Sequence, residues 1–409
     1  MPKENVTNMD GSAHIRLDPT CSICASKENL IRANDNVVIC KKCSDSIHAA
    51  FSEDTDDVVS DVVVPKSKNT PSKIVDFVNQ YVIGQDDAKR TLAIAIYNHY
   101  KRIDNPVLNG VELQKSNILM VGPSGSGKTH LVQSIARMLD VPFYIADATT
   151  VTEAGFVGND VESMLHALIA NANGDVKKAE RGIILCDEVD KIAKKGTGAS
   201  LTKDPSGEGV QQALLKLIEG TDVEVQIAGG RRVSGNATQK INTSNILFVF
   251  AGAFVGLDSI IAQRSEGERG IGFGATVEKT NTKTAVTTED LIAFGMIPEF
   301  VGRIPIVVEL DEMKPEHLVR VLTEPKNSII RQFSALMSVD GAELVVTDAA
   351  IEKIAELAYE RKTGARGLRS IVENVLMDTM FELPDCEQKT IVTVDVADDD
   401  LTVTKSEVC

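Results

Sequence analysis

A glycine-rich loop between a strand and a helix constrains the fold of this chain more than any other feature. Residues 122–129 read Gly-Pro-Ser-Gly-Ser-Gly-Lys-Thr and fit the pattern G-x-x-x-x-G-K-[ST] at every position. An apolar run, 118–121, precedes the loop, and Leu131, Ile135 and Leu139 follow it at four-residue spacing, as in an amphipathic helix. This order predicts a phosphate-binding loop in an α/β fold with a mainly parallel sheet.

The loop has the chemistry to bind a nucleotide. Its glycines let backbone N–H groups turn toward phosphate oxygens, and the helix N-terminus adds partial positive charge. We expect Lys128 to reach the β- and γ-phosphates of ATP and Thr129 to hold Mg²⁺. A glycine-rich turn with a surface lysine is the alternative, and the two flanks disfavour it. The predicted nucleotide contacts are Gly122, Pro123, Ser124, Gly125, Ser126, Gly127, Lys128, Thr129 and His130.

Two acids end a second apolar run, 183–186, about sixty residues after the loop. A carboxylate at a strand tip beside a phosphate loop is placed to bind Mg²⁺, and we assign this role to Asp187. Glu188 is then the general base that polarises the attacking water. An acidic pair at an exposed strand end is common, so the assignment depends on the phosphate loop.

Changes in apolar patterning and composition along the chain predict several domains. A third buried strand is expected at 246–250, because continuous apolar runs suit strands covered on both faces. After about Asp311 helical segments dominate, around 316–336 and 349–361, with a late strand at 390–396. We therefore expect a large α/β domain at 73–311 and a smaller, mostly helical domain at 312–409. Residues 52–72 are acidic and then rich in Pro, Ser and Thr, which predicts a flexible linker.

Four cysteines near the N-terminus predict a zinc site. Cys21 and Cys24 form one C-x-x-C pair, Cys40 and Cys43 form another, and fifteen residues separate the pairs. This spacing is typical of structural zinc sites with four cysteine ligands. Four reduced, buried cysteines are the alternative, which so short and polar a segment disfavours. Residues 1–51 are thus a candidate zinc-binding domain.

The net charge of the chain limits the classes of binding partner that are expected. The chain has 43 basic and 59 acidic residues and a formal net charge of −16. This argues against a membrane or direct nucleic-acid partner, since both favour a cationic surface, although a local basic groove would escape this argument. No apolar run reaches the ~20 residues of a membrane helix, and no targeting segment is evident. We expect a cytoplasmic protein.

Several further motifs, together with the loop and the acids, resemble the ClpX family of AAA+ protein unfoldases. They occur in the family's order across residues 74–409, and the cysteine pairs extend the likeness to the N-terminus. The motifs are Tyr81–Lys89, Gly122–Thr129, Leu185–Lys191, Ser206–Lys216, Ile271–Gly274, Ile297–Arg303 and Thr363–Ser370.

The resemblance implies a homohexameric ring with ATP bound between the large and small domains. It implies that Val82 and Ile83 contact adenine and that Arg366 reaches the nucleotide as the sensor-2 arginine. Arg303 resembles the arginine finger that enters a neighbouring subunit's site. A guanidinium suits both roles because it is always charged and matches phosphate geometry. Without the resemblance, a surface salt bridge would be the preferred interpretation of either arginine.

The resemblance also implies loops that handle protein. Phe156 and Val157 lie between glycines, where the family has a loop that grips polypeptide in the pore, usually with Tyr at the Phe156 position. Arg231 and Arg232 match a basic loop at the pore entrance, although the family usually has His where this chain has Val233. Docking of a ClpP-type peptidase is implied for Ile271, Gly272 and Phe273.

An ATP-dependent unfoldase that supplies a ClpP-like peptidase, with chaperone activity, is therefore the leading hypothesis. The resemblance implies that the zinc domain dimerises and receives adaptors and some protein substrates. A DNA-remodelling AAA+ ATPase is one rival, but it would need neither the Phe156 loop nor the Ile271–Phe273 loop. A chaperone or assembly scaffold without a peptidase is another. The related HslU type lacks the zinc domain, so the four cysteines argue against it.

Overall fold

The computed structural model describes residues 21, 24, 26–27, 29–34, 37–45, 69–108, 110–152, 159–194, 207–226, 238–269, 284–385 and 388–407. The chain divides into two compact units, Met1–Lys66 and Ser67–Cys409. The domain boundaries expected from the sequence are finer than this division and stay predictions.

The first unit contains a β-hairpin next to the cysteines. Strands β1 (Leu30–Asn34) and β2 (Val37–Cys40) pair antiparallel, with Leu30 opposite Cys40. The hairpin thus carries Cys40 at the end of β2, and residues 41–45 continue from it as a helical turn that brings in Cys43.

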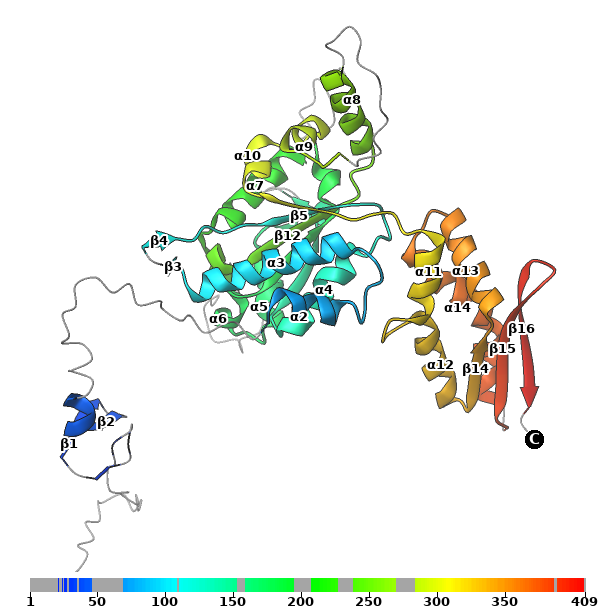
Figure 1. The fold of residues 1–409 in the computed structure, drawn as a ribbon, viewed down its shortest axis with the longest axis horizontal. Coiled ribbons are helices and arrows are strands. Elements are labelled where there is room, and N and C mark those ends of the chain that lie inside the picture. Colours follow the sequence, from blue (N-terminus) through cyan, green and yellow to red (C-terminus); the bar gives the residue numbers. More distant parts are fainter. Residues whose placement is uncertain are drawn as a thin grey trace, which may run out of the picture. The chain divides into compact units, whose positions relative to one another are not determined.

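A five-stranded parallel sheet forms the centre of the second unit, where β5 and β12 are labelled in Figure 1. The strand order is β13-β5-β12-β9-β6. The three strands expected from the sequence are confirmed as β5, β9 and β12, and β6 and β13 extend the sheet at its two edges. The bounds are β5 (Ile118–Val121), β6 (Phe143–Asp147), β9 (Ile183–Asp187), β12 (Leu247–Gly252) and β13 (Ile306–Glu309).

Both faces of this sheet are covered, which explains why its central strands are continuously apolar. In β5, Ile118 and Met120 face one hydrophobic core, and Leu119 and Val121 face the other. The first core contains residues of α2 (Pro71–Val78), α3 (Asp86–Asp104) and α4 (Lys128–Leu139). The second contains residues of α5 (Ser163–Asn171), α7 (Gly207–Glu219), α9 (Thr288–Phe294) and α10 (Pro298–Gly302).

The C-terminal part packs around a third core that extends from Met313 to Val394. Its mostly helical character is confirmed, as is the late strand, β15 (Thr390–Ala397). The expected helical segment at 316–336 is two helices, because Pro325 cannot donate a helical hydrogen bond. The other elements are α11 (Pro315–Thr323), α12 (Ile329–Val339), α13 (Asp348–Glu360), α14 (Ala365–Glu382), β14 (Ala342–Val346) and β16 (Asp400–Glu407).

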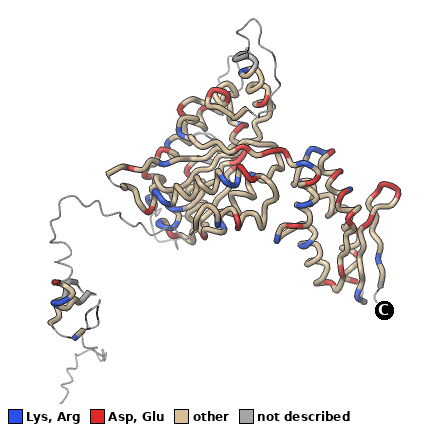
Figure 2. Tube along the Cα trace, viewed as in Figure 1, with Lys and Arg blue, Asp and Glu red and all other residues tan. Residues whose placement is uncertain are grey.

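Acidic and basic residues are interspersed along the described chain (Figure 2). No helix among the described residues is long and apolar enough to span a membrane. The remaining strands and helices are β3 (Val107–Leu108), β4 (Val111–Glu112), β7 (Val151–Thr152), β8 (Asn159–Asp160), β10 (Asp222–Gln226), β11 (Thr238–Asn242), α6 (Val176–Ala179) and α8 (Leu257–Arg269).

Candidate functional site

The glycine-rich loop leaves the carboxyl end of β5 and leads into α4. Gly125 and Gly127 have φ of 77° and 96°, in the left-handed region that glycine adopts without strain. Gly122 also needs to be glycine, because a Cβ there would lie 2.7 Å from the carbonyl oxygen of Leu310. Close approach and turn geometry therefore fix the glycine pattern that the sequence showed.

The loop has polar groups available for an anion. The Ser126 Oγ is buried and has no hydrogen-bond partner among the described residues. The Lys128 Nζ donates to the carbonyl oxygens of Gly122 and Pro123, at 2.6 and 2.9 Å. Burial lowers the pKa of Lys128, while the carboxylates of Asp187 and Asp190 favour its charged form. The residues present fit the phosphate chain of a nucleotide.

The two acids lie at the carboxyl end of β9, next to the loop. The Thr129 hydroxyl donates to Asp187 Oδ2 at 2.8 Å, so the two expected magnesium ligands are in contact. Glu188 is exposed and has a left-handed backbone with φ of 59°. Its backbone N–H donates to Asp187 Oδ1 at 2.9 Å. Hard oxygen ligands of this kind suit Mg²⁺.

One cavity of about 510 Å³ collects most of the residues expected to contact nucleotide. Val82 and Ile83 line it together with the loop from Ser124 to His130, both acids and Arg366. Gly122 and Pro123 are not among its lining residues. Burial lowers the pKa of His130, and a hydrogen bond to the Tyr81 backbone opposes this.

The segment at Val82 and Ile83 is held by two buried or bridging polar side chains. The Lys89 ammonium, 3 % exposed, donates to Asn79 Oδ1 and to the Val82 carbonyl, both at 2.8 Å. The Gln85 amide donates to the Asp311 carbonyl at 2.8 Å and accepts from the Asp311 N–H at 2.9 Å. These contacts fix one wall of the cavity.

The opposite wall contacts the phosphate loop directly. The Ala365 N–H donates to the Gly125 carbonyl at 3.3 Å. A Cβ on Gly125 would lie 2.5 Å from the Thr363 carbonyl oxygen, and one on Gly364 would lie 3.0 Å from the Gly125 carbonyl oxygen. Two glycines therefore allow the start of α14 to approach the loop and bring Arg366 to the cavity.

Asp190 is a cavity residue to which the sequence reasoning gave no role. It is 7 % exposed, accepts from the Ala253 N–H at 3.1 Å, and forms an ion pair with Lys191 at 3.2 Å. Ala253 follows β12, so Asp190 links the carboxyl ends of β9 and β12. Its place three residues after Asp187, at the edge where parallel strands bind ligands, was the signal available in the sequence.

Arg303 does not line this cavity. It caps the end of α10, and its guanidinium pairs with Glu219 Oε1, the last residue of α7, at 2.8 Å. The side chain is 58 % exposed, so it is accessible to a neighbouring molecule. Its backbone carbonyl accepts from the Asn117 side chain at 2.9 Å.

The four N-terminal cysteines converge. Their sulfur atoms all lie within 4.8 Å of one another, and the Cys40 N–H donates to Cys21 Sγ at 3.2 Å. Contacts with the Cys24 thiol, and then with the Cys40 thiol, raise the pKa of Cys43 to about 12. So close a set of sulfur donors fits a tetrahedral metal site, in which a cation would favour the thiolates.

The other predicted site residues lie outside the described residues. They are Phe156 and Val157, Arg231 and Arg232, and Ile271, Gly272 and Phe273.

Comparison with known proteins identifies the family to which the chain belongs. The AAA domain (Cdc48 subfamily) profile matches residues 113–307, and the profile of the C-terminal, D2-small domain of ClpB protein matches 313–393. The protein of Treponema denticola named "ATP-dependent Clp protease ATP-binding subunit ClpX" is 49 % identical over 375 residues, which cover 89 % of this chain and 90 % of the relative. Proteins of the same name from Borrelia duttonii and Borrelia recurrentis are each 49 % identical over 387 residues, covering 92 % of this chain and 90 % of each relative.

The chain belongs to the ClpX family. The fold expected from the sequence, an AAA+ P-loop domain with a parallel sheet followed by a smaller, mostly helical part, is therefore confirmed. The cavity of this ClpX-family chain draws on both matched regions. The AAA region supplies the phosphate loop and the acids, and the D2-small region supplies Met313, Val321, Ala365 and Arg366.

Proposed function

We propose that this chain is an ATP-dependent protein unfoldase and translocase that works as a homohexameric ring, supplies a ClpP-type peptidase and also acts as a chaperone. Membership of the ClpX family, and hence of the AAA+ ATPases, supports this function. The observation that carries the proposal is the cavity shared by the phosphate loop, the acids and Arg366. A site with walls from two parts of the chain suits a motor, because hydrolysis there can change the contact between the parts.

The residues of the cavity divide the work of ATP hydrolysis. The loop N–H groups, Ser126 and Lys128 bind the phosphates, and Val82 and Ile83 contact the adenine. Thr129 and Asp187 would hold Mg²⁺, which supplies positive charge against the developing negative charge on the phosphates. Glu188 accepts a proton from the attacking water. The exposure of Glu188 beside Asp187 leaves room for that water.

Two arginines contact nucleotide, one in its own subunit and one in the neighbouring subunit. Arg366 reaches the phosphates from the start of α14, so its contact depends on the position of the helical part. Arg303 enters the site of the next subunit as the arginine finger. Support for this role comes from its exposed guanidinium and from its absence from the lining of its own cavity.

The four cysteines bind one zinc ion, which stabilises a domain too small to depend on burial alone. The convergence of the four sulfur atoms supports this proposal. The zinc domain dimerises and receives adaptors and some protein substrates. Because no step of ATP hydrolysis uses these cysteines, metal removal should impair substrate delivery more than hydrolysis.

Protein handling is assigned to residues outside the described part. Phe156 and Val157 grip polypeptide in the pore, Arg231 and Arg232 line the pore entrance, and Ile271, Gly272 and Phe273 dock the peptidase. The work occurs in the cytoplasm. A motor is needed because native domains are stable by ~5–15 kcal/mol and some open only over hours to days.

The test combines the protein with ATP, a stably folded tagged reporter and a ClpP-type peptidase. The parent should destroy the reporter only with ATP. Phe156→Ala should hydrolyse ATP and form the ring but slip on the folded reporter, while Phe156→Tyr retains most activity. The same reporter, denatured beforehand, is the control substrate, because its degradation does not require unfolding. If Phe156→Ala unfolds the folded reporter as fast as the parent, the assignment of the pore residue is wrong.

A further inference from the structure

A buried amide links the segment that follows the acids of the nucleotide cavity to the helix that ends at Arg303. Gln211 lies on α7 and is 0 % exposed. Its Nε2 donates to the Ile192 carbonyl at 2.8 Å, and its Oε1 accepts from the Ile297 N–H at 2.9 Å. One side chain therefore joins two backbone segments that are far apart in the sequence.

Both segments belong to elements with a proposed role in hydrolysis. Ile192 ends the short 3₁₀ helix Val189–Ile192, which begins directly after Glu188. Ile297 is the N-cap residue of α10, and Arg303 is the C-cap residue at the other end of that helix. The buried amide thus holds the start of α10 at a fixed place relative to the acids of the same subunit.

A backbone contact supports the same link. The Lys194 N–H donates to the Gly295 carbonyl at 2.8 Å, two residues before Ile297. Gly295 has φ of 119°, and a Cβ there would lie 2.4 Å from the Lys194 carbonyl oxygen. Glycine is therefore needed for this approach. The turn that leads into α10 is held by a side chain and by the backbone.

The far end of α10 carries its charged group at the surface. The ion pair of Arg303 with Glu219 joins side chains that are 58 % and 44 % exposed, and exposed pairs of this kind fix geometry weakly. Helix α10 has only five residues, so it cannot absorb a displacement of its first residue along its length. The direction of the Arg303 guanidinium therefore depends on the buried start of α10.

We propose that Gln211 is a positioning residue for the arginine finger, because it sets the direction in which Arg303 enters the site of the neighbouring subunit. Loss of either bond leaves a buried backbone group without a partner, and the segment has to move to regain one. Gln211 does not line the cavity of its own subunit. The inference rests on the proposed roles of Arg303 and Glu188 in hydrolysis.

The first measurement is ATP hydrolysis by rings of one variant. Gln211→Met keeps the length of the side chain and removes both hydrogen bonds. A small misplacement of a catalytic group can cost about 10²-fold in rate, so we expect hydrolysis to fall roughly ten- to hundredfold. Binding of a fluorescent ATP analogue should stay near the parental affinity, because the cavity keeps all its residues. Gln212→Met is the matched control, since Gln212 is the next residue of α7 and is exposed, and it should hydrolyse ATP at the parental rate.

The decisive measurement mixes subunits to separate the two sites. Glu188→Gln subunits are inactive in their own site but present an intact Arg303 to the neighbour. When Gln211→Met subunits are mixed with an excess of them, turnover per Gln211→Met subunit should rise at least about fivefold, because the neighbour now supplies the finger. A double variant with Glu188→Gln and Arg303→Ala, added in the same excess, should give no rise. Gln211→Glu keeps the acceptor for Ile297 and should show a smaller fall with the same rescue, so the test stands if Gln211→Met does not fold.

Two results would overturn the inference. One is parental hydrolysis by Gln211→Met rings. The other is low hydrolysis that mixing does not restore, which would mark Gln211 as a support of its own site or of the fold. Arg303→Ala, mixed in the same way, tests the function on which the inference rests. If Arg303→Ala subunits are rescued and Gln211→Met subunits are not, only the inference is wrong; if Arg303→Ala rings hydrolyse ATP normally, or are not rescued, the finger assignment itself is wrong.

Discussion

Gly364→Ala should weaken nucleotide binding although Gly364 is outside the phosphate loop. Gly364 precedes α14 with φ of 57° and ψ of −149°, a backbone region that is nearly restricted to glycine. A Cβ there would lie 3.0 Å from the Gly125 carbonyl oxygen and 3.1 Å from the Gly125 carbonyl carbon and Cα. These are backbone atoms, so no side chain can rotate away to make space.

The cost can be worked out from these two effects. An alanine in this region costs ~1–3 kcal/mol in backbone strain, and the crowding against Gly125 adds to it. The chain can relieve both by moving the start of α14 away from the loop, but this also moves Arg366 away from the cavity. Nucleotide binding that needs Arg366 at the cavity must then bring α14 back to the loop, and the free energy of this strain is subtracted from the binding free energy. A cost of ~2 kcal/mol corresponds to roughly thirtyfold weaker affinity.

The assay is equilibrium titration with a fluorescent ATP analogue in the presence of Mg²⁺, together with thermal unfolding. Gly341→Ala is the matched control: Gly341 also has positive φ, 78°, but a Cβ there has no atom within 4 Å. We expect Gly341→Ala to lose a little stability and to bind nucleotide normally. Parental affinity in Gly364→Ala would refute the argument that this close approach shapes the cavity.

Three other predictions follow from the site and from the core. Glu188→Gln should bind nucleotide but hydrolyse it ~10²–10⁴-fold more slowly, whereas Lys128→Ala should weaken binding itself; a normal turnover rate in Glu188→Gln would show that the general base is another group. Metal analysis should find about one zinc per chain, and chelation should unfold the cysteine unit, since structural zinc contributes an apparent ~10–16 kcal/mol; four freely titratable thiols without zinc would contradict this. Burial lowers the pKa of His99 to about 3, so the folded state stays neutral while the unfolded state gains a proton below a pKa of ~6.5. Stability should therefore fall with pH below that value, by ~2 kcal/mol at about pH 5, and His99→Gln should flatten this limb in unfolding titrations; an unchanged slope would exclude His99 as its cause.

Features with local causes could be predicted from the sequence. The loop 122–129, the strands around it and the acids after β9 each depend on contiguous residues, and parallel strands bring their carboxyl ends to one edge. That rule predicts the contact of Thr129 with Asp187. The convergence of the cysteines is equally local, because two C-x-x-C pairs at the two ends of a short hairpin have few other arrangements.

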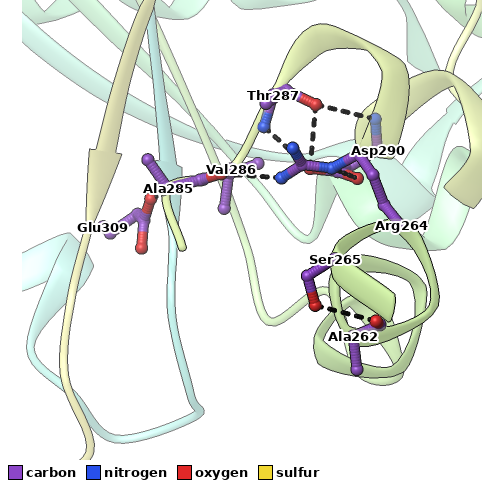
Figure 3. A network of polar contacts seen from close by, with 8 residues as sticks. All are labelled: Ala262, Arg264, Ser265, Ala285, Val286, Thr287, Asp290 and Glu309. Carbon is purple, nitrogen blue, oxygen red and sulfur yellow. Dashed lines mark hydrogen bonds and ion pairs between the residues drawn. The ribbon is translucent and has the colours of Figure 1, made fainter. Parts of the chain in front are cut away.

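Features with non-local causes could not be predicted in this way. The approach of Gly364 to Gly125 joins positions 239 residues apart, and nothing in either segment alone specifies the other. Strands β6 and β13 lie at the sheet edges, where partly buried side chains weaken the apolar pattern. The ion pair between Arg264 of α8 and Asp290 of α9 (Figure 3) also joins two helices, and neither residue's own segment specifies the other.

The wall at Val82 and Ile83 shows how the cavity is assembled from such non-local contacts. The Gln85 side-chain amide forms hydrogen bonds with both the N–H and the carbonyl of Asp311, as a neighbouring strand would. The chain leaving β13 is therefore fixed to the segment for which we propose contact with adenine. The Lys326 N–H donates to the Gln80 carbonyl at 2.9 Å, close to the same segment. This wall of the cavity is therefore attached to both the sheet and the helical part. Under the proposed function, a change at the phosphates that shifts Gly364 acts against these attachments. We therefore expect nucleotide hydrolysis to alter the contact between the two parts at both ends of the cavity.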